Sequence, residues 1–105
     1  MKNEEPEKTV FMAVIAGREL KDALLTVLTD SGIHLVDSYH ARGTVRTDTA
    51  HSLLGLAPEE KRIVITCLST QSKTDAVLAR LAEEFHFDKP HTGIAFTVPI
   101  DKVSY

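Results

Sequence analysis

Residues 9–16, Thr-Val-Phe-Met-Ala-Val-Ile-Ala, decide the fold of this chain, because nearly every position in the run is apolar. A short, continuous apolar run is typical of a β-strand that is buried on both faces. Gly17 follows the run and is expected to end the strand. A strand with two buried faces needs a covering layer on each side, so the rest of the chain, or a partner, has to provide those layers.

Two segments carry the apolar stripe of an amphipathic helix. In residues 18–29 the stripe comprises Leu20, Ala23, Leu24, Val27 and Leu28, and in the second segment it comprises Val77, Leu78, Leu81, Ala82 and Phe85. Both sets recur at the three- and four-residue spacing of one helix face. Gly32 suits the left-handed position after the first helix. The run Ser72-Lys-Thr-Asp75 resembles a capping box with Asp in place of Glu, so we expect the second helix to begin there.

Three further segments alternate as strands do. Residues 33–45 are only half apolar, with Ile33, Leu35, Asp37 and Tyr39 expected on one face. Residues 62–68 place Ile63, Ile65 and Cys67 on one face, and residues 93–100 alternate larger and smaller side chains. Pro99 cannot donate to a ladder, which predicts a sheet edge or a strand end at this position.

The order of these elements is βαββαβ, which predicts an α+β, ferredoxin-like sandwich with a four-stranded antiparallel sheet. Right-handed crossovers put both helices on one face of that sheet. The other face then has no cover within the chain, although the first and third strands are apolar on both faces, so we expect self-association. Residues 1–8 are expected to be a disordered tail, and residues 9–105 a single domain.

Composition excludes several classes of protein. The chain has 105 residues, a formal charge of −3 and no Lys/Arg-rich run, so we expect no nucleic-acid partner. It has one cysteine, Cys67, which we interpret as a buried, reduced thiol of a cytoplasmic protein. The polar, acidic N-terminus does not resemble a signal peptide, and no apolar stretch is long enough for membrane insertion.

Five stretches, in their order and spacing, resemble the PII nitrogen-regulatory family and specifically its shorter PII-like relatives. They are Gly-Ile at 32–33, His-Ala-Arg-Gly-Thr at 40–44, Leu-Leu-Gly-Leu at 53–56, Lys61, and Thr-Gly-Ile-Ala-Phe-Thr-Val-Pro-Ile at 92–100. The resemblance extends from about Thr9 to Val103. It implies a homotrimeric signal-transduction protein that binds an adenine nucleotide (ADP, AMP or ATP) in the clefts between subunits. It also implies that residues 44–60 form the T-loop, which contacts a regulated target protein.

The resemblance also implies which residues bind the nucleotide. They are Arg42, Gly43, Thr44 and Arg46 where the loop leaves the second strand, Lys61, Ile65 and Cys67 on the third strand, and Thr92 and Gly93 before the last strand. By this resemblance Lys61 reaches phosphates, whereas Ile65 and Cys67 line the base pocket. From the residues themselves, Arg42, Arg46 and Lys61 bracket one loop and would form a phosphate- or carboxylate-binding cluster if the strand ends meet.

The chain also departs from the family pattern. Lys89-Pro-His-Thr-Gly93 stands in place of a glycine-rich B-loop with its aspartate and lysine, and a pair of C-terminal arginines has no counterpart. We therefore expect weaker binding of the nucleotide's phosphates, which favours diphosphate or smaller ligands. The loop lacks the tyrosine used for nucleotidylation, so we expect no regulation by that modification. We also expect a target other than the family's usual ammonium channel or glutamine synthetase system, in carbon or bacterial-microcompartment metabolism.

Other chemistry has weak support in the sequence. The five histidines lack metal-ligand spacing, and His40, beside the Arg42-Gly43 turn, is the one expected to contact a ligand. No nucleophile–base arrangement or P-loop is present, so we expect neither an enzyme nor a required cofactor. Two alternatives stay open: a metal-binding trimer similar to the CutA proteins, and a structural PII-like trimer that binds no nucleotide.

Overall fold

The computed structural model describes residues 7–42, 61–89 and 92–101. Its elements are β1 (Thr9–Gly17), a short 3-10 helix η1 (Arg18–Leu20), α1 (Lys21–Asp30), β2 (Val36–Arg42), β3 (Lys61–Thr70), α3 (Gln71–Phe85) and β4 (Gly93–Pro99). The predicted T-loop at 44–60, and with it Gly43, Thr44 and Arg46, lies outside the described residues.

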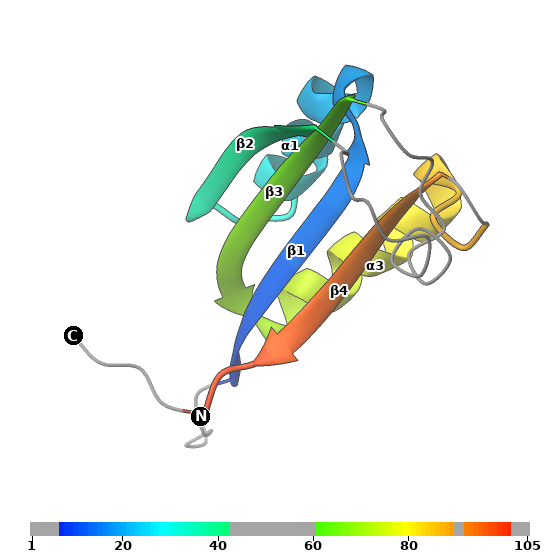
Figure 1. The fold of residues 1–105 in the computed structure, drawn as a ribbon. Coiled ribbons are helices and arrows are strands. Elements are labelled where there is room, and N and C mark those ends of the chain that lie inside the picture. The colour runs from blue at the N-terminus through cyan, green and yellow to red at the C-terminus, as the bar shows by residue number, and fades with distance from the viewer. Residues whose placement is uncertain (1–6, 43–60, 90–91, 102–105) are drawn as a thin grey trace.

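The strands form one antiparallel sheet in the order β2-β3-β1-β4. Both α1 and α3 lie on the same face of this sheet, as Figure 1 shows. The βαββαβ sandwich predicted from the sequence is therefore confirmed. β4 is an edge strand that pairs with β1, and Pro99 is its last residue, in agreement with the prediction for that proline.

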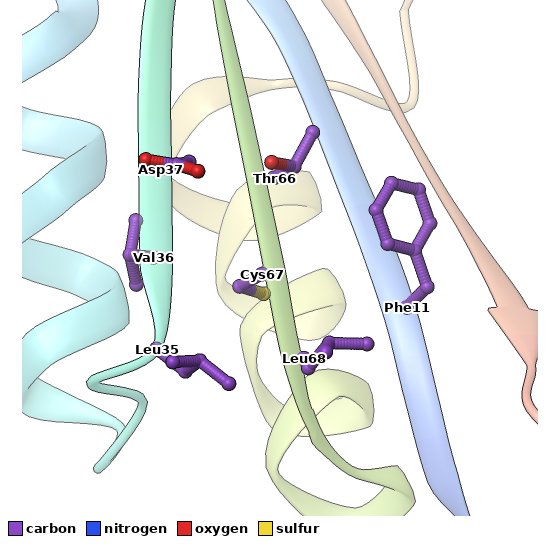
Figure 2. Close-up of a pocket in the computed structure, with 7 residues that line it drawn as sticks. All are labelled: Phe11, Leu35, Val36, Asp37, Thr66, Cys67 and Leu68. Atoms are coloured by element: carbon purple, nitrogen blue, oxygen red, sulfur yellow. The ribbon is translucent and has the colours of Figure 1, made fainter. Parts of the chain in front are cut away.

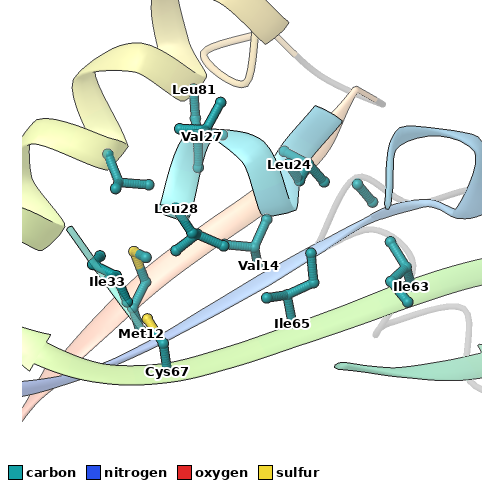
Figure 3. Close-up of a cluster of buried hydrophobic side chains, with 12 residues drawn as sticks. Met12, Val14, Leu24, Val27, Leu28, Ile33, Ile63, Ile65, Cys67 and Leu81 are labelled. Atoms are coloured by element: carbon teal, nitrogen blue, oxygen red, sulfur yellow. The ribbon is translucent and has the colours of Figure 1, made fainter. Parts of the chain in front are cut away.

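The hydrophobic core fills the space between the sheet and the two helices (Figure 3). Its members are buried apolar side chains from every layer: Met12, Val14, Ala16, Leu24, Val27, Leu28, Ile33, Ile63, Ile65, Cys67, Val77 and Leu81. The register pairs Met12 with Cys67 and Val14 with Ile65, so each pair points toward the helices. The alternation predicted for β3 is confirmed.

The segment after α1 ends the helix in a Schellman turn. Ile33 N donates to Leu28 O at 3.0 Å and Gly32 N to Thr29 O at 3.0 Å, with Gly32 at φ 82°. The left-handed glycine predicted at this position is confirmed. Because residues 31–33 belong to this turn, β2 begins at Val36 and not at Ile33 as the pattern predicted. Ile33 is buried against the core and does not share a strand face with Leu35.

The two helix starts also differ from the sequence prediction. The first helix opens as the 3-10 turn η1, and Ala23 lies at the edge of its buried face and is exposed. The cap of α3 is Thr70, whose hydroxyl accepts from Lys73 N, and not Ser72. Ser72 instead donates through its backbone N and its hydroxyl to the Glu7 carboxylate, at 3.0 Å each. Glu7, which the sequence placed in the disordered tail, therefore satisfies donors at the start of α3.

The second face of the sheet carries apolar side chains that no described helix covers. The large exposed ones are Leu35, Tyr39, Leu68, Phe96 and Val98. The register puts the last four on this open face, and Leu35 directly precedes β2. Leu35 and Tyr39 are 66% and 55% exposed. The bare apolar face expected from the sequence is thus present in the single chain. None of the described helices has the length and apolar character needed to cross a membrane.

Candidate functional site

A hollow of about 330 Å³ opens on the uncovered face of the sheet, beside the start of β2 (Figure 2). Its walls are Phe11, Leu35, Val36, Asp37, Thr66, Cys67 and Leu68. Asp37 and Thr66 are register partners, so a carboxylate and a hydroxyl lie side by side among apolar groups. Apolar walls with a few polar groups are typical of small-molecule sites, and this hollow is at the lower end of their size range.

Cys67 lines this hollow, although its side chain points to the helix side of the sheet. The thiol is free and buried, and burial raises its pKa, while a backbone hydrogen bond with Met12 opposes that rise. It is therefore held in the neutral form and is a poor nucleophile. Ile65, the other predicted base-pocket residue, is 1% exposed in the core and does not line the hollow. Its side chain can support such a pocket only from beneath.

Those of the predicted phosphate-binding residues that the structure describes lie at the opposite end of the sheet. Arg42 and Lys61 are register partners, so the two strand ends meet as the sequence argument required. Gly17 pairs with the β3 residue next to Lys61, and Ala16 pairs with Gly93, so the start of β4 lies at the same end. Lys61 is exposed there. The structure thus brings Arg42, Lys61 and Gly93 to one end of the sheet.

The loop before β4 is closed by its own contacts. The Thr92 hydroxyl lies 2.7 Å from His86 O and 2.8 Å from Lys89 O and donates between these two carbonyls. A Cβ added at Gly93 would stand 2.5 Å from the Phe87 ring. Phe87 in turn packs edge-on against Phe85, with ring centroids 6.2 Å apart. Close packing against Phe87 is therefore sufficient to explain a glycine at position 93.

The hollow and the basic end lie at opposite ends of the sheet. Val36 pairs with Cys67 beside the hollow, whereas Arg42 pairs with Lys61 at the basic end. Six residues of extended strand separate these pairs, or roughly 20 Å at the usual rise per residue. A nucleotide that used both features would have to span this length within one chain or lie between two copies of the chain.

Two further basic residues lie at this end and were missed by the sequence analysis. Arg18 donates through Nη2 to Ala41 O at 3.4 Å, and Lys21 opens α1 next to it. The pKa of His40 is lowered, most strongly by the positive charge of Arg18, then by burial, and then by the positive charge of Lys21. Arg18 and Lys21 precede β2 by a whole helix, so the sequence pattern could not place them beside His40. In the part of the chain that the structure describes, no group of His, Cys, Asp and Glu residues could hold a metal ion.

No protein-family model and no curated protein sequence matches this chain. Solved structures do match. One is a protein of Thermus thermophilus assigned to the PII-like signalling proteins, with 18% identity, a TM-score of 0.66, and coverage of 90% of this chain and 88% of that one. Another is CPII of Thiomonas intermedia, a nitrogen regulatory PII-like protein bound to ADP, AMP and bicarbonate. It has 14% identity, a TM-score of 0.62, and coverage of 88% and 89% of the two chains.

A third match is a functionally unknown protein of Pediococcus pentosaceus. It has 9% identity and a TM-score of 0.66, over 95% of this chain and 99% of that one. At these identities the likeness establishes the fold. The predicted resemblance to PII-like proteins is confirmed at that level, over nearly the whole chain.

Proposed function

We propose that this chain is a PII-like signalling protein that forms a homotrimer and binds an adenine nucleotide between subunits. The observation that carries the proposal is the separation of the hollow from the basic end by roughly 20 Å of strand. In a trimer, the basic end of one copy would face the hollow of its neighbour. The apolar open face supplies the surface that such an assembly buries.

The nucleotide would be held by the residues that the sequence analysis named. Arg42, Gly43, Thr44, Arg46 and Lys61 would surround the phosphates, with Thr92 and Gly93 on the far side. The base would occupy the hollow above Cys67, with Ile65 beneath it and the Asp37 carboxylate placed to accept from an amino group. Because Lys89-Pro-His-Thr-Gly93 stands in place of the glycine-rich loop, ADP or AMP is favoured over ATP. The binding of ADP and AMP by the Thiomonas protein of the same fold supports this ligand class.

Nucleotide binding would then be passed to a target protein through residues 44–60. A ligand shifts such an equilibrium only by its differential affinity for the two states, and a few kcal/mol is sufficient. This is a sensing role in the cytoplasm, without chemistry on the ligand. Bicarbonate, which the Thiomonas protein also binds, is a reasonable second ligand to test.

Calorimetry with AMP, ADP and ATP tests the binding step directly. We expect micromolar to submillimolar binding of ADP or AMP, weakened about tenfold by Lys61→Ala, which is the loss of one charge-assisted phosphate contact. Lys8→Ala, which removes an exposed lysine at the other end of β1, is the matched control and should bind normally. Absence of heat with all three nucleotides at millimolar concentration would overturn the proposal in favour of a structural trimer.

Subunit exchange tests where the nucleotide lies. Asp37→Ala damages only the hollow, and Lys61→Ala damages only the basic end. If each site is shared between copies, mixing the two variants creates some interfaces with both halves intact and restores part of the binding. If each site lies within one chain, mixing restores none, and the shared site is wrong.

Sedimentation tests the assembly. Val98→Asp puts a charge on the open face and is expected to give monomers, whereas Ala79→Asp, on the exposed side of α3, should leave the trimer intact. A wild-type chain that sediments as a monomer at all concentrations would remove the trimer from the proposal.

A further inference from the structure

Three basic side chains converge on the helix side of the sheet, at the end of β2. Arg18 lies in η1, directly after β1, and Lys21 is the first residue of α1. His40 is the register partner of Ile63, a core residue, so it faces the helix layer and not the open face. The influence of Arg18 and Lys21 on His40 is seen in the lowered pKa of this histidine. These residues come from separate segments, and the fold alone brings them together.

The Arg18 guanidinium is only partly satisfied. Nη2 donates to Ala41 O, which anchors the side chain against the last residues of β2. Nε is buried and has no hydrogen-bond partner. A buried, unpaired donor costs about 1–3 kcal/mol, so Arg18 is held in this position at an energetic cost. Nη1 and the second N–H of Nη2 form the terminal edge of the guanidinium, and this edge presents the fork that donates to two oxygens of an anion in parallel hydrogen bonds.

The local charge is also unbalanced. Within the described ranges, neither Arg18 nor Lys21 forms an ion pair. The neighbouring acids do not compensate them: Glu19 turns its carboxylate toward Gly17, and Asp22 is exposed on α1. No side chain caps the start of α1, so the partial positive charge of its first turn adds to the same region.

We propose that Arg18, Lys21 and His40 bind a small oxyanion, a phosphate or a carboxylate, at a site separate from the nucleotide. Arg18 would hold two of its oxygens through its terminal nitrogens, and Lys21 would act as a point charge. His40 would donate from the edge strand. The site would join η1 and α1 to the last residues of β2. It does not depend on assembly of the trimer, because all of its groups lie within one chain.

Occupancy has a spectroscopic signature at His40. The charged groups that face it are Arg18 on η1 and Lys21 on α1, with Lys61 opening the neighbouring strand. In the free protein the first two favour neutral imidazole. A bound anion opposes them and favours the protonated form, so its binding raises the pKa of His40. By linkage, anion affinity increases as pH falls through that pKa.

The test is an NMR titration of the histidine resonances of the full-length protein with phosphate, acetate and chloride at constant ionic strength. We expect the His40 resonance to saturate with phosphate or acetate but not with chloride, and its pKa to rise when the anion is bound. Preference between phosphate and acetate identifies the source of the oxyanion. Linear, equal shifts with all three salts would indicate screening only and would overturn the site.

Variants separate this site from general charge effects. Arg18→Gln and Lys21→Gln should each weaken the saturable response about tenfold or more, whereas Lys8→Gln, which removes the same charge at the far end of β1, should leave it unchanged. Lys21 is at the protein surface, so Lys21→Gln reports on binding even if Arg18→Gln proves unstable. Equal weakening by Lys8→Gln would contradict a localised site.

A competition experiment distinguishes this proposal from the proposed function. If ADP and phosphate bind additively, the oxyanion site is separate, as we propose. If ADP displaces phosphate from His40, the cluster belongs to the site that binds the nucleotide's phosphates, and the proposal of a separate site is wrong. If phosphate saturates while no nucleotide binds, the nucleotide proposal fails and the oxyanion site stands.

Discussion

The two faces of the sheet share the same strands but differ in what covers them. On one face, α1 and α3 bury the apolar side chains of β1 and β3 almost completely. On the other, apolar residues of all four strands remain, and several are exposed in the single chain. β3 shows the contrast within one strand, with Ile65 enclosed by the helices and Leu68 at the edge of the hollow. The covered face therefore accounts for the stability of one chain, and the open face is available for assembly and ligand.

The largest expected effect comes from truncating one residue on each face of β3. Ile65→Ala leaves a cavity in the core and should lower the free energy of unfolding by about 3 kcal/mol at every protein concentration. Leu68→Ala removes a side chain that only a neighbouring copy would cover, so its cost should depend on protein concentration. Urea denaturation over a hundredfold range of concentration measures both. If both variants lowered the free energy of unfolding by the same amount at every protein concentration, the two faces would not differ as described.

The next effect tests the close packing at the start of β4. Gly93→Ala forces its methyl group against the Phe87 ring, and overpacking of this kind costs about 1–3 kcal/mol. Combining it with Phe87→Leu, which makes room, should recover part of that loss in thermal denaturation. If the double variant is no more stable than the sum of the single variants predicts, the glycine is needed for another reason.

A smaller effect tests which residue caps the start of α3, the longer helix on the covered face. Thr70→Ala removes the observed cap and should cost about 1 kcal/mol, or less because the bond to Lys73 N is long at 3.4 Å. Asp75→Ala, at the position that the sequence pattern assigned to a capping box, should cost less. Urea titrations of both variants rank them. The reverse order would favour a helix start at Ser72.

The smallest effect concerns a surface pair on α3, away from both sheet faces. Arg80 donates to Glu84 through Nε and Nη2, at 2.9 and 3.1 Å, and this hydrogen bonding lowers the pKa of Glu84. A lowered carboxyl pKa gives stability above the unfolded-state pKa that is lost as pH falls through the folded-state pKa. Glu84→Gln should therefore be slightly destabilising at neutral pH and neutral at low pH or high salt. Glu83→Gln, its exposed neighbour, is the control and should show no such pH dependence.

The fold could be predicted because its signals are local. The apolar run of β1, the two helical stripes and the alternation in β3 each depend on residues close in sequence, and Gly32 marked the helix end. The boundaries that differed involve distant partners. Ser72 donates to Glu7, 65 positions away, and Ile33 leaves its expected strand because the core takes it into the turn after α1.

The candidate site divides in the same way. The sequence by itself determined that Arg42 and Lys61 flank the connection between the second and third strands, that one sheet face lacks a helical cover, and which family the ordered motifs resemble. Only the tertiary structure decided that Ile65 is buried beneath the hollow, and that Gly93 accommodates Phe87. It alone brought Arg18 and Lys21 beside His40. Hydrophobic periodicity specifies which face of an element is buried, but pairing register and helix docking decide which distant side chains meet, and those choices depend on the whole chain.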